Sequence, residues 1–411
     1  MGHTHSNFEV SVRTRRVLAV AAGLAALLTV IGLVALWPSG DPSDEVDDLG
    51  FTPDLYDARL EALTEGPCEG TTPEEDVVCA NATVRLLQGP DRGASIDLDL
   101  PPSGSGPSFE VGDVLVVSYD SSAPDGFQYG FADRNRKPVL WWLAGLFALT
   151  VVLLGRLRGF AALAGLAASF VVLLKFVLPA VVAGTDPLAV AVVGASAIAF
   201  VALYLAHGFG PMTSVALLGT LASLGVTVVL ARVFVELVGL SGFASEEASF
   251  VNVATTRVDL AGLVLGGIVI GALGAIDDMT VTQASVVAEL RDANPALGPV
   301  RLFAAAMRIG RDHVASTVNT LALAYAGASM PLLVLFVLSE QSLGSIVNGE
   351  VIATELIRTL VGSIGLVTAV PLTTWLAVVA LSGHPPIALP RWLKRLDRRS
   401  GDAPAPKDVV N

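Results

Sequence analysis

Apolar residues in this chain gather into long runs, and polar residues fall mainly in the short gaps between them. A helix needs about 20 apolar residues to cross a hydrocarbon core of roughly 30 Å. Eight runs are candidate spans: Val17–Trp37, Val139–Leu157, Phe160–Ala183, Leu188–Ala206, Met212–Val238, Leu260–Ala275, Val314–Leu338 and Val351–Leu381. The last is long for one span, and Leu260–Ala275 is short. The pattern predicts an α-helical polytopic membrane protein with a TM1 anchor at 17–37 and a seven-helix membrane bundle at 138–383. The composition agrees, with 53% hydrophobic and only 15% charged residues.

Basic residues indicate the orientation, because Lys and Arg in short loops mark the cytoplasmic side. With eight spans, the strongest basic groups all fall on one face: Arg13, Arg15, Arg16, Arg156, Arg158, Arg291, Arg301, Arg308, Arg311, Arg391, Lys394, Arg395, Arg398 and Arg399. The opposite loops carry Asp186, Glu246, Glu247, Glu340 and Glu350, although Arg134–Lys137 also fall there. We therefore expect a bacterial cytoplasmic membrane protein with cytoplasmic tails at 1–16 and 384–411, the second basic and disordered.

The first apolar run has the basic start and apolar core of a signal peptide. Its length suffices to span, and Leu33–Trp37 offers no small-x-small cleavage site, so we interpret it as an uncleaved anchor. The formal charge of −13 arises largely from the exterior acidic segment and gives no reason to expect a nucleic-acid partner.

Residues 38–137 differ in character and predict an extracytoplasmic linker followed by a small β-domain. Asp41–Asp54 is acidic and contains proline, as is typical of a linker. Val77–Leu87, Ala94–Leu100 and Val111–Tyr119 read as strands, with period-two alternation clearest in the second. Turn residues separate them, so we expect a compact β-barrel-like domain between TM1 and TM2.

The chain's two cysteines, Cys68 and Cys79, both lie in this exterior region. An oxidising exterior favours a disulfide between them. A metal site is the competing interpretation, but it requires more ligands than two thiols.

Ionisable residues inside predicted spans are costly and therefore informative. Lys175 lies well within the third span, four residues before Pro179, which frees a main-chain carbonyl near it. Arg358 in the eighth span lies three residues after Glu355, a spacing that allows the two charges to pair. Snorkelling or structural pairing near a helix end competes with a functional role for both.

The most distinctive local feature is a glycine-rich run, Gly266–Gly274, that leads into Asp277 and Asp278 and then Thr280. Glycine allows neighbouring helices to pack closely. Two adjacent carboxylates followed by hydroxyl groups suit a hard cation or a proton relay. The alternative is that the glycine-rich helix ends here and one aspartate caps a new helix at Thr280–Leu290.

Two further polar segments are expected at the same cytoplasmic boundary. Asn319 and Thr320 enter the seventh span from its inner end, and Asn319 needs a hydrogen-bonding partner there. His207 opens the loop between the fourth and fifth spans. Their convergence with Asp278 suggests a polar site near the cytoplasmic side of the sixth and seventh spans, with Asp277 the more replaceable aspartate.

Three elements together resemble the YibE/F-like membrane proteins: Gly-Ala-Ile-x-Asp ending at Asp278, Gly-Arg-Asp at Gly310–Asp312, and Asn-Thr-Leu-x-Leu-Ala-Tyr-x-Gly-x-Ser-x-Pro at Asn319–Pro331. The resemblance extends from about Val17 to Leu381 and includes the order of anchor helix, exterior β-domain and helical bundle. Members of the family commonly have a hydrophobic residue where this chain has Asp277. The resemblance implies the architecture and the choice of residues, but no particular reaction, cofactor or substrate.

Two classes of function remain open. The first is a transporter or channel for a small solute or ion, with these candidate binding residues: Asp278, Asp277, Thr280, Asn319, Thr320, Lys175, Arg358 and His207. The second is a non-transporting envelope protein whose β-domain binds an extracytoplasmic protein partner. We do not expect an enzyme, because the sequence contains no His-Glu-x-x-His, phosphate-binding loop or Gly-x-Ser-x-Gly, and adjacent aspartates on one helix point about 100° apart.

Overall fold

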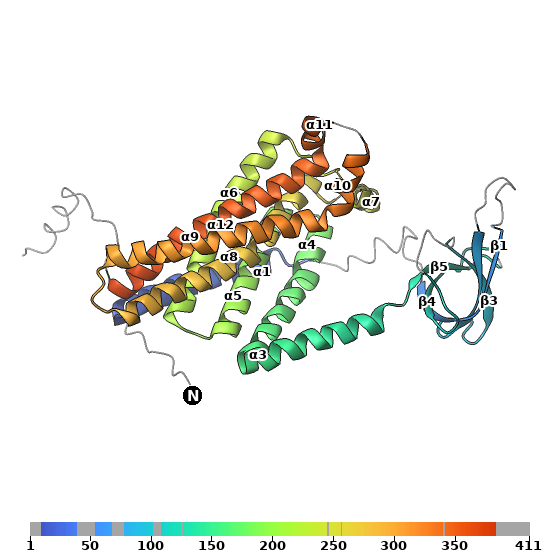
Figure 1. The fold of residues 1–411 in the computed structure, drawn as a ribbon, viewed down its shortest axis with the longest axis horizontal. Coiled ribbons are helices and arrows are strands. Elements are labelled where there is room, and N and C mark those ends of the chain that lie inside the picture. Colours follow the sequence, from blue (N-terminus) through green and yellow to red (C-terminus); the bar gives the residue numbers. More distant parts are fainter. Residues whose placement is uncertain are drawn as a thin grey trace, which may run out of the picture. The chain divides into compact units, whose positions relative to one another are not determined.

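The computed structural model describes residues 10–38, 54–67, 78–101, 108–124, 126–244, 246–255, 257–339 and 342–383. The chain divides into two compact units, one formed by 43–156 and the other by 1–42 together with 157–411. The protein is mostly helical, with several long apolar helices and a separate curled antiparallel sheet (Figure 1). Each unit is described by itself below.

The sheet has five antiparallel strands in the order β3-β2-β1-β4-β5. Its strands are β1 (Asp54–Pro67), β2 (Val78–Leu86), β3 (Ser95–Leu100), β4 (Val114–Tyr119) and β5 (Tyr129–Arg134). The two edge strands, β3 and β5, approach one another, so the sheet curls into a partly open barrel. Alternate residues point inwards and bury a core that includes Leu60, Leu86, Leu115 and Val117.

The sequence prediction found three of these strands and missed β1 and β5. The missed β1 is the central strand, paired with both β2 and β4. Its sequence, from Asp54 to Pro67, is rich in charged residues, which are poor strand formers; Ala58 and Leu60 are buried in the core, and Tyr56 and Leu63 pack against it. Pairing on both edges therefore overrides its weak local preference. The predicted start of β4 was also early, because Gly112 adopts φ 100° in a turn before Val114.

Several predictions fall on residues that the structure does not describe. Cys68 is one of them, so its disulfide with Cys79 stays a prediction; the main chain of Cys79 pairs with that of Gly66 in β2 and β1. The predicted linker from Asp41 to Pro53 and both chain termini also lie outside the described residues.

The helices of the chain begin with α1 (Val12–Ala35) and α3 (Lys137–Val172), which are separated by the sheet. They continue with a π-helix η1 (Leu173–Val177), α4 (Leu178–Val182), α5 (Pro187–His207), α6 (Pro211–Val238), α7 (Glu246–Ala254), α8 (Leu260–Ala293), α9 (Pro299–Ala328), α10 (Met330–Leu338), α11 (Leu343–Asn348) and α12 (Glu350–Ser382). Proline occupies the first turn of α5, α6 and α9, where its missing N–H has no cost.

Among the described residues, six helical segments are long and apolar enough to cross a membrane, or up to seven if the bent pair of α9 and α10 forms one span. The pair bends by 64° at Ser329, next to Pro331. The α3 helix holds one non-helical residue, Arg156 (φ 52°, ψ −129°), which separates two of the predicted spans. The predicted number of eight spans is not confirmed by this count.

The alternative in which the glycine-rich helix ends at the aspartates is wrong, because the helix does not break there. Helix α8 runs continuously from Leu260 to Ala293, with Asp259 at its N-cap position. Asp277 and Asp278 therefore lie in mid-helix, and neither caps a helix that starts at Thr280. The predicted span Leu260–Ala275 was short only because polar residues follow it, while the main chain stays helical beyond them.

Helix α8 lies at the centre of the larger unit and packs against α5, α6, α9 and α12. Helices α6 and α12 approach closely through two glycine contacts. A Cβ atom on Gly219 would collide with Thr373, and one on Gly365 would collide with Thr227. Small residues thus set the separation of the two helices, as is common in membrane bundles. Helix α1 packs on α5 and α6.

Candidate functional site

One face of α8 is exposed and carries no apolar side chain. Between Leu260 and Leu290, the exposed residues of this helix are Gly267, Gly271, Gly274, Asp278, Ser285 and Glu289. Their spacings of three, four and seven residues place them on a single face. At 1.5 Å per residue, Gly267 and Glu289 lie about 33 Å apart along the axis, close to the thickness of a hydrocarbon core.

Helix α12 shows the opposite pattern. Its exposed residues between Glu350 and Ser382 are Leu356, Leu360, Ile364, Val367 and Trp375, all of them apolar. An apolar stripe of this kind suits contact with lipid tails. The face of α8 does not, because a lipid chain offers a carboxylate no hydrogen bond.

At one end of the α8 face, a charged pair approaches the glycines. Arg358 Nη1 donates to Glu355 Oε1 at 2.6 Å, which confirms the predicted pairing within α12. A Cβ atom on Gly267 would lie 3.8 Å from Arg358 Nη2, and one on Gly271 would lie 3.2 Å from the hydroxyl oxygen of Tyr325. The glycines therefore leave room for an arginine and a tyrosine to reach α8. Arg358 Nε is buried with no hydrogen-bond partner in the described part of the chain.

In the middle of the face, Asp278 has a 71% exposed side chain. Its Oδ2 atom lies 4.0 Å from Nε2 of His313, which projects from α9. Gly274 lies one turn further along, and nothing lies within 4 Å of an added Cβ there. Space beside Asp278 is thus open on the glycine side.

Asp277 is oriented differently from its neighbour, towards the interior between α8 and α6. Its Oδ1 atom is buried and has no hydrogen-bond partner among the residues described. Thr220 of α6 interacts with the carboxylate, and the hydroxyl groups of Thr220 and Thr280 are hydrogen-bonded at 2.7 Å. Both threonines are fully buried. Of the two aspartates, Asp277 is the one that shares an interior site with Thr280.

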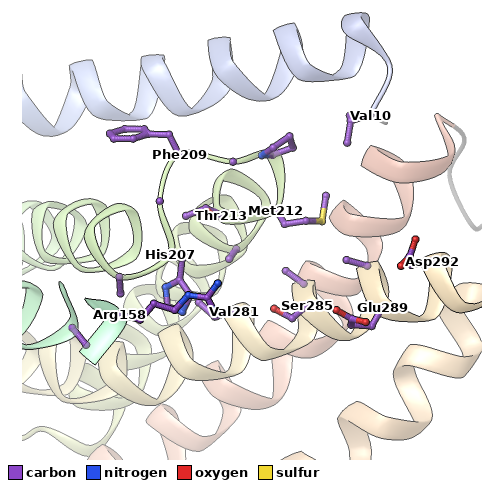
Figure 2. Close-up of a pocket in the computed structure, with 18 of the residues that line it drawn as sticks. Val10, Arg158, His207, Phe209, Met212, Thr213, Val281, Ser285, Glu289 and Asp292 are labelled. Carbon is purple, nitrogen blue, oxygen red and sulfur yellow. The ribbon is translucent and has the colours of Figure 1, made fainter. Parts of the chain in front are cut away.

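A pocket of about 1370 Å³ lies beside the C-terminal half of α8 (Figure 2). Figure 2 shows Ser285, Glu289 and Asp292 projecting from α8 along one wall. Arg158 and the candidate residue His207 contribute positive or titratable groups to the lining. The pocket therefore has cationic and anionic groups, with the acidic ones on the helix that carries Asp278.

Lys175 does not join these groups. It is exposed within the π-helix η1, and it has no acidic partner in the part of the chain that the structure describes. The π-helix follows from Pro179, which has no N–H for the Lys175 carbonyl; Leu178 N instead donates to Leu173 O, five residues earlier.

Asn319 and Thr320 do not contact Asp278 through any hydrogen bond between described residues. Both are exposed on α9, and the Thr320 hydroxyl donates to the main-chain oxygen of Ser316. His313 occupies the place beside Asp278 that we expected them to take. The groups described above come from α6, α8, α9 and α12, since His313 and Tyr325 of α9 lie beside Asp278 and Gly271.

Sequence reasoning missed the hydroxyl and amide groups of the bundle core. Thr220, Ser223 and Thr227 of α6 are fully buried and lie at i, i+3 and i+7, a spacing that the sequence contains. Gln283 Nε2 donates to Ala306 O at 3.1 Å and to Thr374 Oγ1 at 2.7 Å, linking α8 with α9 and α12. Thr373 Oγ1 has no hydrogen-bond partner among described residues.

The family model of the YibE/F-like proteins matches residues 143–383. The match includes α8, α9 and α12, which carry the groups described above, and most of the larger unit. The chain belongs to the YibE/F-like family. The matched region starts after the sheet, so the family identification concerns the helices and leaves out α1 and the β-domain. No curated protein and no solved structure matches the chain. The family and the apolar helices together indicate a membrane protein.

Proposed function

We propose that this YibE/F-like protein is a transporter or channel for a small solute or ion, with its polar path along the exposed face of α8. The observation that carries the proposal is the contrast between two helices of one bundle. The exposed face of α8 holds only glycine, serine and acidic residues, whereas that of α12 holds only apolar residues.

The contrast favours water or solute on the α8 side. A carboxylate at the position of Asp278 would be costly against lipid, and membrane proteins keep such groups for pathways or paired sites. Gly274 leaves open space beside Asp278, and at Gly267 and Gly271 the polar ends of Arg358 and Tyr325 take the place of side chains of α8.

Each end of the path has polar or charged groups that would meet a solute. Arg358 and Tyr325 approach the glycines at one end, and Glu289 and Asp292 line the pocket at the other. Lipid-facing snorkelling does not account for Arg358, because its Nη2 lies near Gly267 of a neighbouring helix. Together these groups support passage of a polar or charged species and supply no set that suggests catalysis.

We place the protein in the bacterial cytoplasmic membrane with eight spans and cytoplasmic termini. Division of α3 at Arg156 adds one span to the six long helices, and the bent pair of α9 and α10 adds another. Arg15 and Arg158 line the same pocket, which supports a common basic side for the start of α1 and the break of α3 near Arg156.

The β-domain supports a second candidate function. It is a separate unit with its own buried core, which a transport path along α8 does not require. An envelope protein that binds an extracytoplasmic protein partner through this domain would need no solute path at all.

Transport in proteoliposomes separates the two functions. Purified full-length protein would be reconstituted and tested by solid-supported-membrane electrophysiology with Na⁺, K⁺, Mg²⁺, phosphate and amino acids, and by osmotic swelling for neutral solutes. We expect a saturable response to at least one class, reduced by Asp278→Asn and retained in Leu360→Ala on the apolar face of α12. The absence of any response above protein-free vesicles would contradict the proposal and favour the envelope function.

A further inference from the structure

The interior site around Asp277 gathers oxygen atoms from two helices. Asp277 Oδ1 is buried without a hydrogen-bond partner among described residues, beside Thr220 and Thr280, which are fully buried. A buried carboxylate oxygen that nothing satisfies is costly in a protein interior. Such an atom is a suitable ligand for a water molecule or an ion.

The two hydroxyl oxygens keep unused lone pairs in their contact with one another. Their oxygen atoms lie 2.7 Å apart, so one hydroxyl donates to the other. The accepting hydroxyl can donate to the main chain, Thr220 Oγ1 to Ala216 O at 3.1 Å or Thr280 Oγ1 to Asp277 O at 2.9 Å. Each hydroxyl oxygen has two lone pairs, of which this contact uses at most one, so both oxygens can also bind a cation.

We infer that Asp277, Thr220 and Thr280 bind a monovalent cation of the sodium class. Hard cations prefer carboxylate and hydroxyl oxygens of this kind. A single carboxylate balances a single positive charge. In the described part of the chain, no three His, Cys, Asp or Glu residues gather around a position for a metal ion, which disfavours a multivalent occupant.

The large pocket approaches the site along α8. Asp277 precedes Val281, Ala284 and Ala288 by four, seven and eleven residues, so all four lie on one side of α8. Those three residues line the pocket, as does Ala216, one turn before Thr220 on α6. The lining of the pocket therefore ends about one helical turn from Asp277.

This inference rests on the proposed transport function in one respect, since the cation would be the ion that is coupled to, or carried with, the solute. Its test is binding of ²²Na⁺ to purified full-length protein in detergent, where no transport is needed. If the wild-type protein transports a solute but does not bind ²²Na⁺, only this inference is contradicted. Binding without any transport would contradict the proposed function alone.

The binding experiment compares Asp277→Asn and Thr220→Val with two matched controls. Asp312→Asn removes an exposed carboxylate on α9, and Thr368→Val removes a hydroxyl that bonds only to Gly365 O of its own helix. We expect saturable binding of about one ion per chain, lost in Asp277→Asn, at least tenfold weaker in Thr220→Val and unchanged in both controls. Thr220→Ser keeps the hydroxyl and should bind ²²Na⁺ as the wild type does. This comparison with Thr220→Val separates loss of an ion ligand from misfolding.

Three results would overturn the inference. The first is wild-type protein with no saturable binding, and the second is Asp277→Asn protein that binds as well as the wild type. The third is an infrared carbonyl band of a protonated carboxylic acid that disappears in Asp277→Asn while ²²Na⁺ does not bind, because the site would then hold a proton.

Discussion

The hydroxyl oxygens of Thr220 in α6 and Thr280 in α8 lie 2.7 Å apart, and neither residue is exposed. This contact joins two helices at the level of Asp277, where an apolar bundle would be expected to use only packing. Hydrogen bonds between membrane helices contribute modestly to stability, but they fix the relative rotation of the helices and thereby the position of the carboxylate.

The threonine pair should behave as one unit in unfolding experiments. Thr220→Val and Thr280→Val should each lower the free energy of unfolding by about 1 kcal/mol, and the double variant should cost clearly less than their sum, because both remove the same bond. Denaturant unfolding in detergent measures this. Additive losses would show that the hydroxyls do not interact, and Thr368→Val serves as the control for removal of a hydroxyl bonded within its own helix.

Close packing of α6 on α12 gives a second prediction. Gly365→Ala should lower the melting temperature, since the new Cβ would collide with the side chain of Thr227. Thr227→Ala should recover most of that loss in the double variant by removing the colliding group. Gly225→Ala is the matched control, because nothing lies within 4 Å of an added Cβ at Gly225. Equal losses in Gly365→Ala and Gly225→Ala would contradict the packing.

Sequence patterns predicted the long apolar helices because a span requires continuous apolar residues whatever its neighbours are. They did not predict the extent of α8, since Asp277 and Asp278 look like a helix end when their partners are unknown. The orientation of the two aspartates depends on which side of α8 faces α6, and a single chain's pattern does not give that. The central β1 was missed for a similar reason, because its pairing with two strands outweighs its composition.

For the same reason, the sequence did not reveal most partners of the candidate residues. The family element that ends at Asp278 drew attention to the exposed aspartate, whereas burial and the threonine hydroxyls single out Asp277. The Glu355–Arg358 pair was predictable because it lies within one helix. The approach of Arg358 to Gly267 was not, because it depends on the packing of α12 against α8.

Orientation in the membrane can be tested by labelling. Single cysteines at Ser103 and Ser400, both outside the described residues, should differ in reactivity towards an impermeant thiol reagent added to intact cells. We expect Ser103→Cys to react and Ser400→Cys to react only after the membrane is opened, because the basic loops place the C-terminus inside. Equal labelling of the two in intact cells would refute the topology.

The two cysteines, which we expect to lie outside the membrane, give a chemical prediction. Mass spectrometry of non-reduced peptides should find Cys68 linked to Cys79, as an oxidising compartment favours. Reduction should then lower the melting temperature of the protein, with a contribution of about 2–3 kcal/mol expected for a short loop. Free thiols at both positions, in protein purified without reductant, would rule out the bond.

The central claim is that the exposed face of α8 contacts water. Its most direct measurement is the reaction rate of single cysteines with a charged, membrane-impermeant methanethiosulfonate, in protein whose Cys68 and Cys79 are replaced by serine. Gly274→Cys and Ser285→Cys test α8, and Ile364→Cys and Val367→Cys on α12 are the matched lipid-facing controls. The account predicts that both α8 positions react at least tenfold faster than both α12 positions in membranes. Slow reaction at Gly274→Cys and Ser285→Cys, equal to that on α12, would show that lipid or protein covers this face and would contradict the account.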